Sequence, residues 1–468
     1  MGSYHGRRLH EFEGFSELSD FVTTHGSYSS PKGTFEEFER QLSRRMRKLE
    51  SEIAAQHLAR YDVDADRVTV DGIVYRKCLS QEPKTYRSGS GPVTVRRNLY
   101  RPKGGCKSIC PLELRAGIVG GFFTPVLASQ VLYLMGLMTS CDAEKLFEVM
   151  EIPGPSSSSC DRMPKVFNNA WEEHREEWEE ALRCQESVPA EATVMAVSLD
   201  GVMIPDKDAQ AEAKRQRAEA EKSKKPGKQK TGPAGFKEVG CGTVTLYDDA
   251  GDRLETTCYG RAPEYKKKTL TEQLDAEVAS VLAARPDLLL VALADGAEEN
   301  WRYFDLPAWA DAIKIVDFWH ACEHIQAGLQ TYYGAKSVSG RAEFGRLRVL
   351  LRDKENGVEA VLKSFQSIYR KLRSKTRRKE LLKEIRYFKN QRERMNYAEY
   401  QKLGLPIGSG VVEAACKTLA VQRMKRSGMS WRDGKQGILS IRSLQQSHRW
   451  WRGWNLVASS FKKDVLAA

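Results

Sequence analysis

The sequence has no uninterrupted run of about 18 apolar residues, and we therefore expect no membrane-spanning helix. Its first residues also lack the apolar stretch of a secretory signal peptide. These two absences predict a cytoplasmic protein. The ten cysteines are scattered along the chain and are expected to be reduced thiols, because disulfides are rare in that compartment.

The spacing of the cysteines gives little support for a zinc site. Cys106 and Cys110 lie close together and Cys78 is nearby, but no second pair follows at the spacing that zinc ligands usually have. A zinc ribbon is one interpretation of these residues, and ordinary buried cysteines are the favoured one. Zinc is therefore not among the expected cofactors.

Acidic residues are fewer than basic ones. The 468 residues include 62 Asp and Glu against 74 Lys and Arg, which gives a formal net charge of +12. An excess of this size suits a polyanionic partner such as nucleic acid, although a basic soluble protein without that role has the same balance. The length favours roughly two to four domains. The 41% of hydrophobic residues suffice for a sizeable core.

The N-terminal part predicts two small regions that carry no catalytic motif. Residues 1–65 are expected to begin as an irregular polar tail and to continue as one amphipathic helix over 34–60, capped near Ser30 or Thr34. Residues 66–112 place short alternating apolar stretches between Gly-rich turns. This pattern predicts a small β module.

Residues 113–190 have the spacing of several short helices. A helix that begins near Ser140, a Pro-Gly-Pro turn and a Ser-capped helix over about 160–171 follow one another. This order outlines a helix-turn-helix DNA-binding domain, in which the last helix is the recognition helix. Arg162 and Lys165 on that helix are the expected DNA contacts. Any small helical bundle has a similar outline, so a bundle without DNA contact is the alternative.

Strands and helices alternate in the part of the chain that follows. Apolar runs predict five strands, with one amphipathic helix between the third and the fourth. The strands are expected over 194–200, 239–247, 253–259, 288–295 and 312–318, and the helix over 270–282. This is the element order of an RNase H-like α/β core, which we assign to 191–320 and 406–468. An all-helical insertion over 321–405 interrupts that core.

Three acidic residues are expected to meet at the edge of this sheet. Asp200 and Asp295 each end an apolar run, and Glu413 opens a helical stretch after a Gly-Ser-Gly turn. Three carboxylates in one cleft repel each other unless cations lie between them. Their oxygens suit two Mg²⁺ or Mn²⁺ ions bridged by Asp200, and such a pair of ions serves phosphoryl transfer. We therefore predict that these three residues are both the metal ligands and catalytic residues.

A histidine lies between the second and the third acid. The run Asp317-Phe318-Trp319-His320 follows the last predicted strand and begins a helical pattern. His320 is predicted to be an auxiliary catalytic residue that orients the scissile phosphate or a carboxylate. A packed structural histidine is the alternative.

Two basic segments are candidate DNA contacts. Residues 206–235 are rich in Lys and Arg and lack apolar periodicity, so we predict a mobile basic loop, which is either a solvated spacer or an arm along the DNA backbone. Residues 366–400 of the insertion hold twelve Lys and Arg against four Glu, which favours DNA contact. The expected contacts in these segments are Lys222, Lys224, Lys225, Lys375, Arg377 and Arg378.

The acidic residues stand in motifs that resemble those of a known family, the DDE transposases. The three similar motifs are Leu199-Asp200-Gly201, Ala294-Asp295-Gly296 and Gly408-Ser409-Gly410-Val411-Val412-Glu413. Asp317-x-x-His320 is similar to a signature of transposase superfamilies with helical insertions. The resemblance covers roughly residues 66–455.

Two further stretches resemble bacterial insertion-sequence transposases. The tail that starts with Arg423-Met424-Lys425 resembles the segment after the catalytic glutamate, and Arg423, Lys425 and Arg426 are expected DNA contacts. Pro111-Leu112-Glu113 and Thr124-Pro125 resemble the N-terminal region of the Kra-type insertion-sequence family. The long basic loop after Pro205 departs from a minimal core of this kind.

The resemblance implies a DNA transposase. Such an enzyme binds the terminal inverted repeats of its element, hydrolyses phosphodiester bonds to give 3′-hydroxyl ends and joins those ends to target DNA. It works as a homodimer or a larger assembly and is associated with the nucleoid. Two alternatives remain open: an RNase H-like structure-selective nuclease or resolvase, and a domesticated DNA-binding regulator, which would be expected to have a damaged acidic triad.

Overall fold

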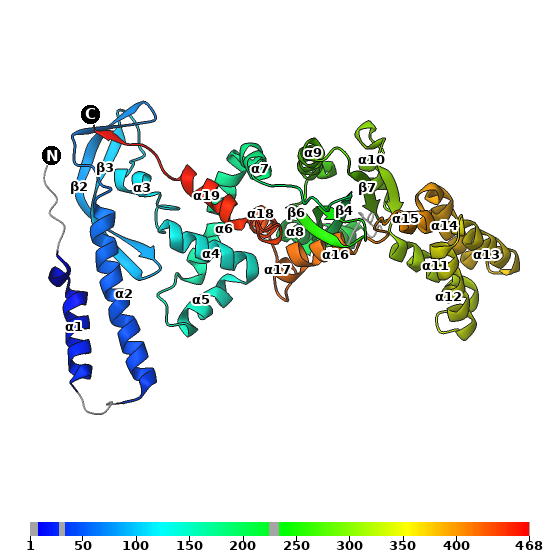
Figure 1. Cartoon of the computed structure of the whole chain (residues 1–468), viewed down its shortest axis with the longest axis horizontal. Coiled ribbons are helices and arrows are strands. Elements are labelled where there is room, and N and C mark those ends of the chain that lie inside the picture. The colour runs from blue at the N-terminus through cyan, green and yellow to red at the C-terminus, as the bar shows by residue number, and fades with distance from the viewer. Residues whose placement is uncertain (1–7, 28–32, 224–233, 468) are drawn as a thin grey trace. The chain divides into compact units, whose positions relative to one another are not determined.

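The computed structural model describes residues 8–27, 33–223 and 234–467 (Figure 1). It is a mixed α/β structure with two sheets and many helices, divided into two compact units. The first unit comprises 1–178 together with 450–468, and the second comprises 179–449. Within the described ranges, no helix combines the length and the apolar character needed to cross a bilayer.

The first unit begins with two helices that pack on each other. They are α1 (Glu13–Gly26), preceded by the short η1 (Leu9–Glu11), and α2 (Phe35–Ala59), which starts at a capping box between Thr34 and Glu37. The prediction of an irregular N-terminal tail is therefore wrong for the residues of α1. Its apolar residues Phe15, Leu18, Phe21 and Val22 recur at helical spacing, and Phe21 stacks on Phe38 of α2 with ring centroids 5.3 Å apart.

A four-stranded antiparallel sheet of order β3-β2-β1-β9 forms the β module. Its strands are β1 (Arg67–Val70), β2 (Ile73–Ser88), β3 (Gly91–Pro102) and β9 (Leu466–Ala467). β2 and β3 are longer than the predicted strands. Much of β2 is exposed and carries few apolar residues, so the apolar pattern of the sequence does not reveal its full length. β9 pairs with β1, so the end of the chain belongs to this unit and not, as predicted, to the core part over 406–468.

The predicted helical region is present. It contains α3 (Pro111–Ala116), α4 (Pro125–Leu137), α5 (Ser140–Val149), α6 (Ser157–Glu173) and α7 (Arg175–Arg183), and α19 (Trp450–Ser460) joins it from the C-terminal end. One face of α6 is buried through Met163, Phe167 and Trp171. Arg162 and Lys165 lie on the exposed side of this helix. The helix-turn-helix assignment stays a prediction.

The second unit is built on a five-stranded sheet of order β6-β5-β4-β7-β8. The five predicted strands are present as β4 (Val194–Pro205), β5 (Phe236–Tyr247), β6 (Arg253–Arg261), β7 (Leu289–Ala294) and β8 (Ile313–Val316). The predicted end of the first strand at Asp200 is wrong, because β4 continues to Pro205 by pairing with β5. β4 lies in the centre, antiparallel to β5 and parallel to β7. The connecting helices are η2 (Tyr265–Lys267), α9 (Lys268–Ala284), α10 (Glu298–Phe304) and η3 (Pro307–Trp309).

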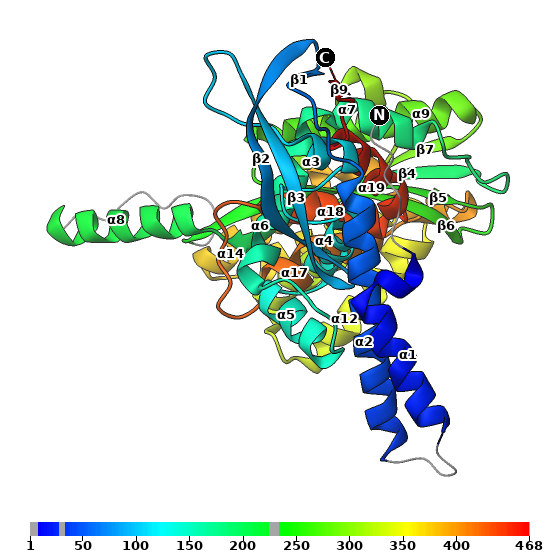
Figure 2. The same ribbon diagram turned by 90° about the vertical axis from the view of Figure 1, so that its left-hand side faces the viewer.

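The segment after β4 is helical rather than a loop. α8 (Lys207–Ser223) extends away from the sheet (Figure 2). The predicted mobile loop over 206–235 is therefore wrong for 207–223. Ala, Glu, Lys, Arg and Gln dominate α8, and these residues favour helix even where no apolar face exists. Fully buried Asp206 anchors its start, accepting hydrogen bonds from the backbone of Asp208 and Ala209 and pairing with Lys435.

The insertion over 321–405 is helical, as predicted, and it packs on the sheet. It contains α11 (Phe318–Tyr333), α12 (Val338–Asp353), α13 (Gly357–Lys371), α14 (Lys375–Asn390), η4 (Arg392–Arg394) and α15 (Tyr397–Lys402), which gather beside β7 in Figure 1. One apolar core runs without interruption from the strands into these helices. The insertion is thus a packed part of the second unit.

The chain then returns to the sheet through three short elements and one longer helix. They are α16 (Gly410–Ala415), the π-helical turn η5 (Cys416–Val421), α17 (Gln422–Met424) and α18 (Lys435–Gln446). Segments with π-helical turns are often found at functional sites.

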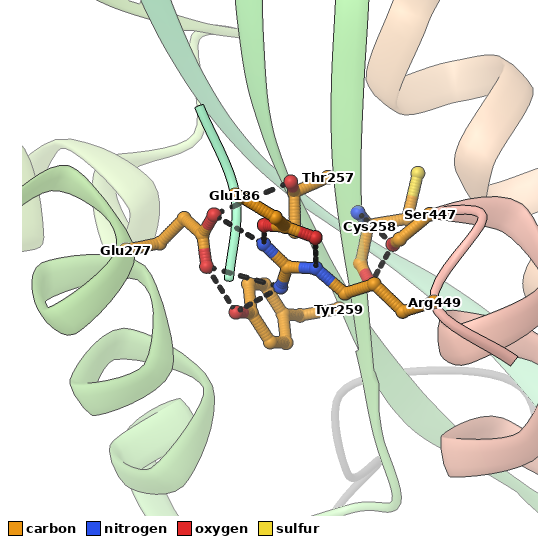
Figure 3. Close-up of polar contacts among 7 residues, drawn as sticks. All are labelled: Glu186, Thr257, Cys258, Tyr259, Glu277, Ser447 and Arg449. Atoms are coloured by element: carbon orange, nitrogen blue, oxygen red, sulfur yellow. Dashed lines mark hydrogen bonds and ion pairs between the residues drawn. The ribbon is translucent and has the colours of Figure 1, made fainter. Parts of the chain in front are cut away.

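A buried arginine ties the end of this unit to the sheet (Figure 3). Arg449 is 3% exposed, and its guanidinium contacts two carboxylates, those of Glu277 on α9 and Glu186. Its Nη1 also donates to the Tyr259 hydroxyl at 3.1 Å. Burial lowers the pKa of a guanidinium, but the surrounding oxygens outweigh it and raise the pKa of Arg449, so this residue stays charged.

Replacement of this arginine should destabilise the second unit. In Arg449→Ala, the buried carboxylate of Glu277 would lose its cation, which costs about 3–5 kcal/mol of unfolding free energy. Urea denaturation measures the change. Arg432→Ala, which removes an exposed pair with Asp208, is the control and should cost less than about 1 kcal/mol. Equal effects of the two variants would contradict the expectation.

Candidate active site

Asp200 lies on β4, and Asp295 directly follows Ala294, the last residue of the neighbouring strand β7. β4 and β7 are parallel, and the last registered pair is Ser198 with Leu293. Continued two residues further, this register would place Asp295, the first residue after β7, beside Asp200. Neighbouring strands are about 4.8 Å apart, and residues opposite each other point to the same face. The two carboxylates interact electrostatically, as expected for this placement.

The loop after β7 holds Asp295 by its backbone and by one carboxylate oxygen. Oδ1 accepts hydrogen bonds of 3.0 Å from the Ala297 backbone and from Nδ2 of Asn300. The indole Nε1 of Trp301 donates to the Asp295 carbonyl at 2.7 Å. Asn300 and Trp301 belong to α10 and are buried, so this helix fixes the second acidic motif.

Glu413 is brought to the same edge by α16. Its Oε1 accepts a 3.1 Å hydrogen bond from Ser409 Oγ. Cys416 lies three residues after Glu413 and its thiol contacts Asp200 Oδ2 at 3.6 Å. Cys416 is the residue directly after α16, so the end of this helix lies beside Asp200. Glu413 itself is exposed.

Asp317 joins the third motif to the insertion. This carboxylate is fully buried. Its Oδ1 accepts a hydrogen bond from the His320 backbone at 2.6 Å, which caps α11, and its Oδ2 accepts one from the Ser409 backbone. Asp317 thus holds the Gly-Ser-Gly turn that precedes Glu413. His320 is half-buried in the first turn of α11, and its predicted auxiliary role stays a prediction.

The electrostatics of the site centre on Asp200. Burial raises its pKa above the ordinary 3.8, and the Asp295 carboxylate raises it further. The Gly201 backbone, at 2.7 Å from Oδ1, and the Cys416 thiol oppose the shift by hydrogen bonding. A hydrogen bond with Cys241 and burial raise the pKa of Cys416, which therefore stays a neutral thiol donor.

A buried lysine lies beside the acidic pair. Lys267 Nζ is 2.9 Å from Glu238 Oε1 and 3.3 Å from Oδ1 of Asn300, the residue that holds Asp295. Its charge lowers the pKa of Asp200. Lys267 and Lys266 both adopt left-handed backbone conformations, with φ of 52° and 54°. Two such residues in succession are strained, and strain of this kind clusters at functional sites.

The three acidic residues are chemically suited to hard divalent cations, but their carboxylates are not close enough together to bind one ion. Asp200, Asp295 and Glu413 offer carboxylate oxygens, the ligands that Mg²⁺ and Mn²⁺ prefer. Among the residues that the structure describes, however, no three His, Cys, Asp or Glu side chains are close enough together to hold a metal ion. Asp200 and Asp295 interact electrostatically, and the side chain of Glu413 is exposed.

The predicted DNA contacts fall into three groups. Lys375, Arg377, Lys425 and Arg426 are exposed, whereas half-buried Arg378 donates to the Leu372 carbonyl at 2.7 Å. Lys222 lies in the last turn of α8, while Lys224 and Lys225 are outside the described residues.

The prediction that Arg423 contacts DNA is corrected, because this residue is only 4% exposed. Its guanidinium lies 5.3 Å from the centroid of the Trp431 ring. We therefore assign Arg423 to packing.

Sequence reasoning missed several residues of this site. Lys267 has a signal in its own triplet of lysines, 266–268, and Cys416 could have been found as the residue one turn after Glu413. Asn300 has a weaker signal, since it follows Asp295 by five residues. None of these signals shows which side chain faces the carboxylates, because that depends on packing between distant segments.

Comparisons with known proteins identify no family. No family model matches the sequence, and no curated protein matches it. Among solved structures, the chain is similar to a "Drosophila P element transposase strand transfer complex", with 9% sequence identity over 73% of this chain and 82% of that chain and a TM-score of 0.25. A likeness at this score carries no argument about function, which is therefore argued from the site itself.

Replacement of Asp200 by a neutral isostere should stabilise the metal-free protein at neutral pH. Because burial raises the pKa of Asp200, ionisation favours the unfolded chain once the pH exceeds the ordinary value of 3.8. Below that pH both states are protonated and the effect is absent. Asp200→Asn should therefore raise the melting temperature in EDTA at pH 7, with a gain that shrinks as the pH falls toward 4. Asp249→Asn, in the exposed β5–β6 turn, should show no such trend.

Weakening the hydrogen bonds to Asp317 should make the backbone around the third acidic motif more mobile. In Asp317→Asn, an amide donor replaces one of the two acceptor oxygens, leaving a backbone N–H unpaired at a cost of about 1–3 kcal/mol of unfolding free energy. Amide hydrogen exchange should accelerate at His320 or Ser409. Ser374→Ala, which removes the cap of α14, is the control and should leave Ser409 exchange unchanged. Unchanged exchange at both amides in Asp317→Asn would contradict this role.

Proposed function

We propose that the protein is a DDE-type DNA transposase with an RNase H-like catalytic core. One observation carries the proposal: Asp200 on the central strand β4 interacts electrostatically with Asp295, the residue after the parallel strand β7, and the thiol of Cys416, which follows the Glu413 helix, contacts Asp200. The sheet order β6-β5-β4-β7-β8 supports the RNase H-like assignment. The similarity of its motifs to the Kra-type insertion-sequence family belongs to the same proposal.

Asp200, Asp295 and Glu413 are the residues that would hold two Mg²⁺ or Mn²⁺ ions. Bound ions of this kind activate a water or 3′-hydroxyl nucleophile and stabilise the leaving oxygen. The chain contributes the orientation of its ligands: α10 holds Asp295, and Asp317 holds the turn before Glu413. Binding of the ions would require the three carboxylates to come closer together, since no group of three metal-binding side chains is present among the described residues.

DNA is the substrate class that the surface supports. Lys375 and Arg377 at the start of α14, and Lys425 and Arg426 after α17, are exposed cations in the same unit as the site. Arg162 and Lys165 on α6 are candidates for recognition of the terminal inverted repeats. Contacts of this kind neutralise phosphates and make binding dependent on salt. The proposed enzyme acts as a homodimer or larger assembly.

Metal-dependent cleavage of an end-bearing duplex tests the proposal. The labelled duplex carries the element end taken from the DNA that flanks the gene, with Mg²⁺ or Mn²⁺. Wild type should release 3′-hydroxyl ends and join them to a second duplex. Asp200→Ala should lower the rate about 100-fold or more, because the ions stabilise the transition state by several kcal/mol. Asp249→Asn, at the opposite end of the sheet, should retain wild-type activity.

The other outcomes separate the alternatives. Cleavage without joining would favour a structure-selective nuclease or resolvase. Tight binding of the end without any cleavage by wild type would favour a DNA-binding regulator. Cleavage that persists in Asp200→Ala would contradict the assignment of the site.

A further inference from the structure

Tyr387 of the helical insertion lies against the loop that carries Asp295. A Cβ atom added to Gly296 would lie 2.1 Å from Cε2 of the Tyr387 ring. No side chain fits in that space, so the ring packs directly on the Gly296 backbone, next to Asp295. A residue 91 positions further along the chain, on α14, therefore borders the second acidic motif.

The ring of Tyr387 is held on its other side by a histidine. It stacks on His324 of α11, with centroids 3.6 Å apart and an angle of 21° between the rings. His324 Nδ1 is 2.5 Å from Oε2 of Glu384, which lies one turn before Tyr387 on α14. Glu384 is buried at 7% exposure. The three side chains thus form a fixed group, and the place of the Tyr387 hydroxyl is set by packing.

The Tyr387 hydroxyl oxygen is buried and has no hydrogen-bond partner in the described part of the chain. Buried polar groups in folded proteins nearly always have a partner, and an exception calls for an explanation. Burial raises the pKa of Tyr387, and the carboxylates of Asp295, Asp317, Glu384 and Glu323 raise it further. The hydroxyl therefore stays protonated and can serve as a donor to a carboxylate.

One of the two carboxylate oxygens of Asp295 is available as a hydrogen-bond acceptor. The two hydrogen bonds from Ala297 and Asn300 both go to Oδ1. Oδ2 accepts none of the hydrogen bonds found among the described residues. A buried donor without an acceptor and a carboxylate oxygen without a donor therefore border the same glycine.

We propose that Tyr387 is a positioning residue of the site, whose hydroxyl donates a hydrogen bond to Asp295 when that carboxylate turns into its metal-binding orientation. The proposal rests on the function proposed above. It assigns the insertion a part in the site: α14 supplies an outer partner of the second acidic residue. Outer partners of this kind orient metal ligands, and their loss weakens metal binding about 10- to 100-fold.

Binding of Mn²⁺ alone to the full-length protein tests the proposal without requiring activity. Tyr387→Phe removes only the hydroxyl and should weaken Mn²⁺ binding about 10- to 100-fold in calorimetric titration. The melting temperature of the metal-free variant should not fall, because the lost hydroxyl has no partner in that state. Cleavage of the end-bearing duplex should decrease while DNA binding in EDTA stays unchanged.

Tyr397→Phe is the matched control. Tyr397 is also a buried tyrosine of the insertion, but its hydroxyl donates to the Val316 carbonyl at 2.9 Å. This variant should lower the melting temperature and leave Mn²⁺ affinity unchanged. Wild-type Mn²⁺ affinity in Tyr387→Phe would overturn the positioning role alone. A wild type that neither binds Mn²⁺ nor cleaves would overturn the proposed function as well, which distinguishes the two failures.

Discussion

The geometry of the site depends on contacts that hold the two ends of the helical insertion together. About ninety residues separate the last strand of the sheet from the third acidic motif, and the two ends of that segment are hydrogen bonded to each other: the Phe318 backbone donates to the Ile407 carbonyl at 2.9 Å. Closing a long flexible loop costs entropy, so contacts at its two ends are needed to keep them together. Asp317 supplies a second such contact, because it accepts a hydrogen bond from the Ser409 backbone at the other end.

Two aspartates of this region show how hydrogen bonding distinguishes a structural carboxylate from a candidate metal ligand. Asp317 is fully buried and each of its oxygens accepts a backbone N–H. Asp200 is half-buried, accepts one N–H and a thiol, and adjoins the Asp295 carboxylate. The second arrangement costs stability, which proteins tolerate where a site needs it. A cation bound between Asp200 and Asp295 would relieve their repulsion.

The elements found by sequence reasoning are those with a local signal. Strands β4 to β8 have apolar runs, and α2 has Thr34 at its cap, so each was predictable from its own residues. α8 was missed because it lacks an apolar face, although its residues favour helix. β9 was missed because two exposed residues become a strand only by pairing with β1. The candidate acids were predictable from their motifs, whereas Tyr387 was not, since its place depends on contact with Gly296.

Helix α14, which borders Asp295, also carries exposed cations. The length of the helix sets the distance between these cations and Asp295. Lys375 and Tyr387 lie twelve residues apart on α14, which corresponds to about 18 Å along the helix axis. The helix is fixed in place, because its core is continuous with that of the sheet. A DNA strand whose scissile phosphate lies at Asp295 and which follows α14 would meet Lys375 and Arg377 about five base pairs away, at about 3.4 Å per step. Under the proposed function, the insertion thus links the chemistry at one phosphate to backbone contacts half a helical turn along the duplex.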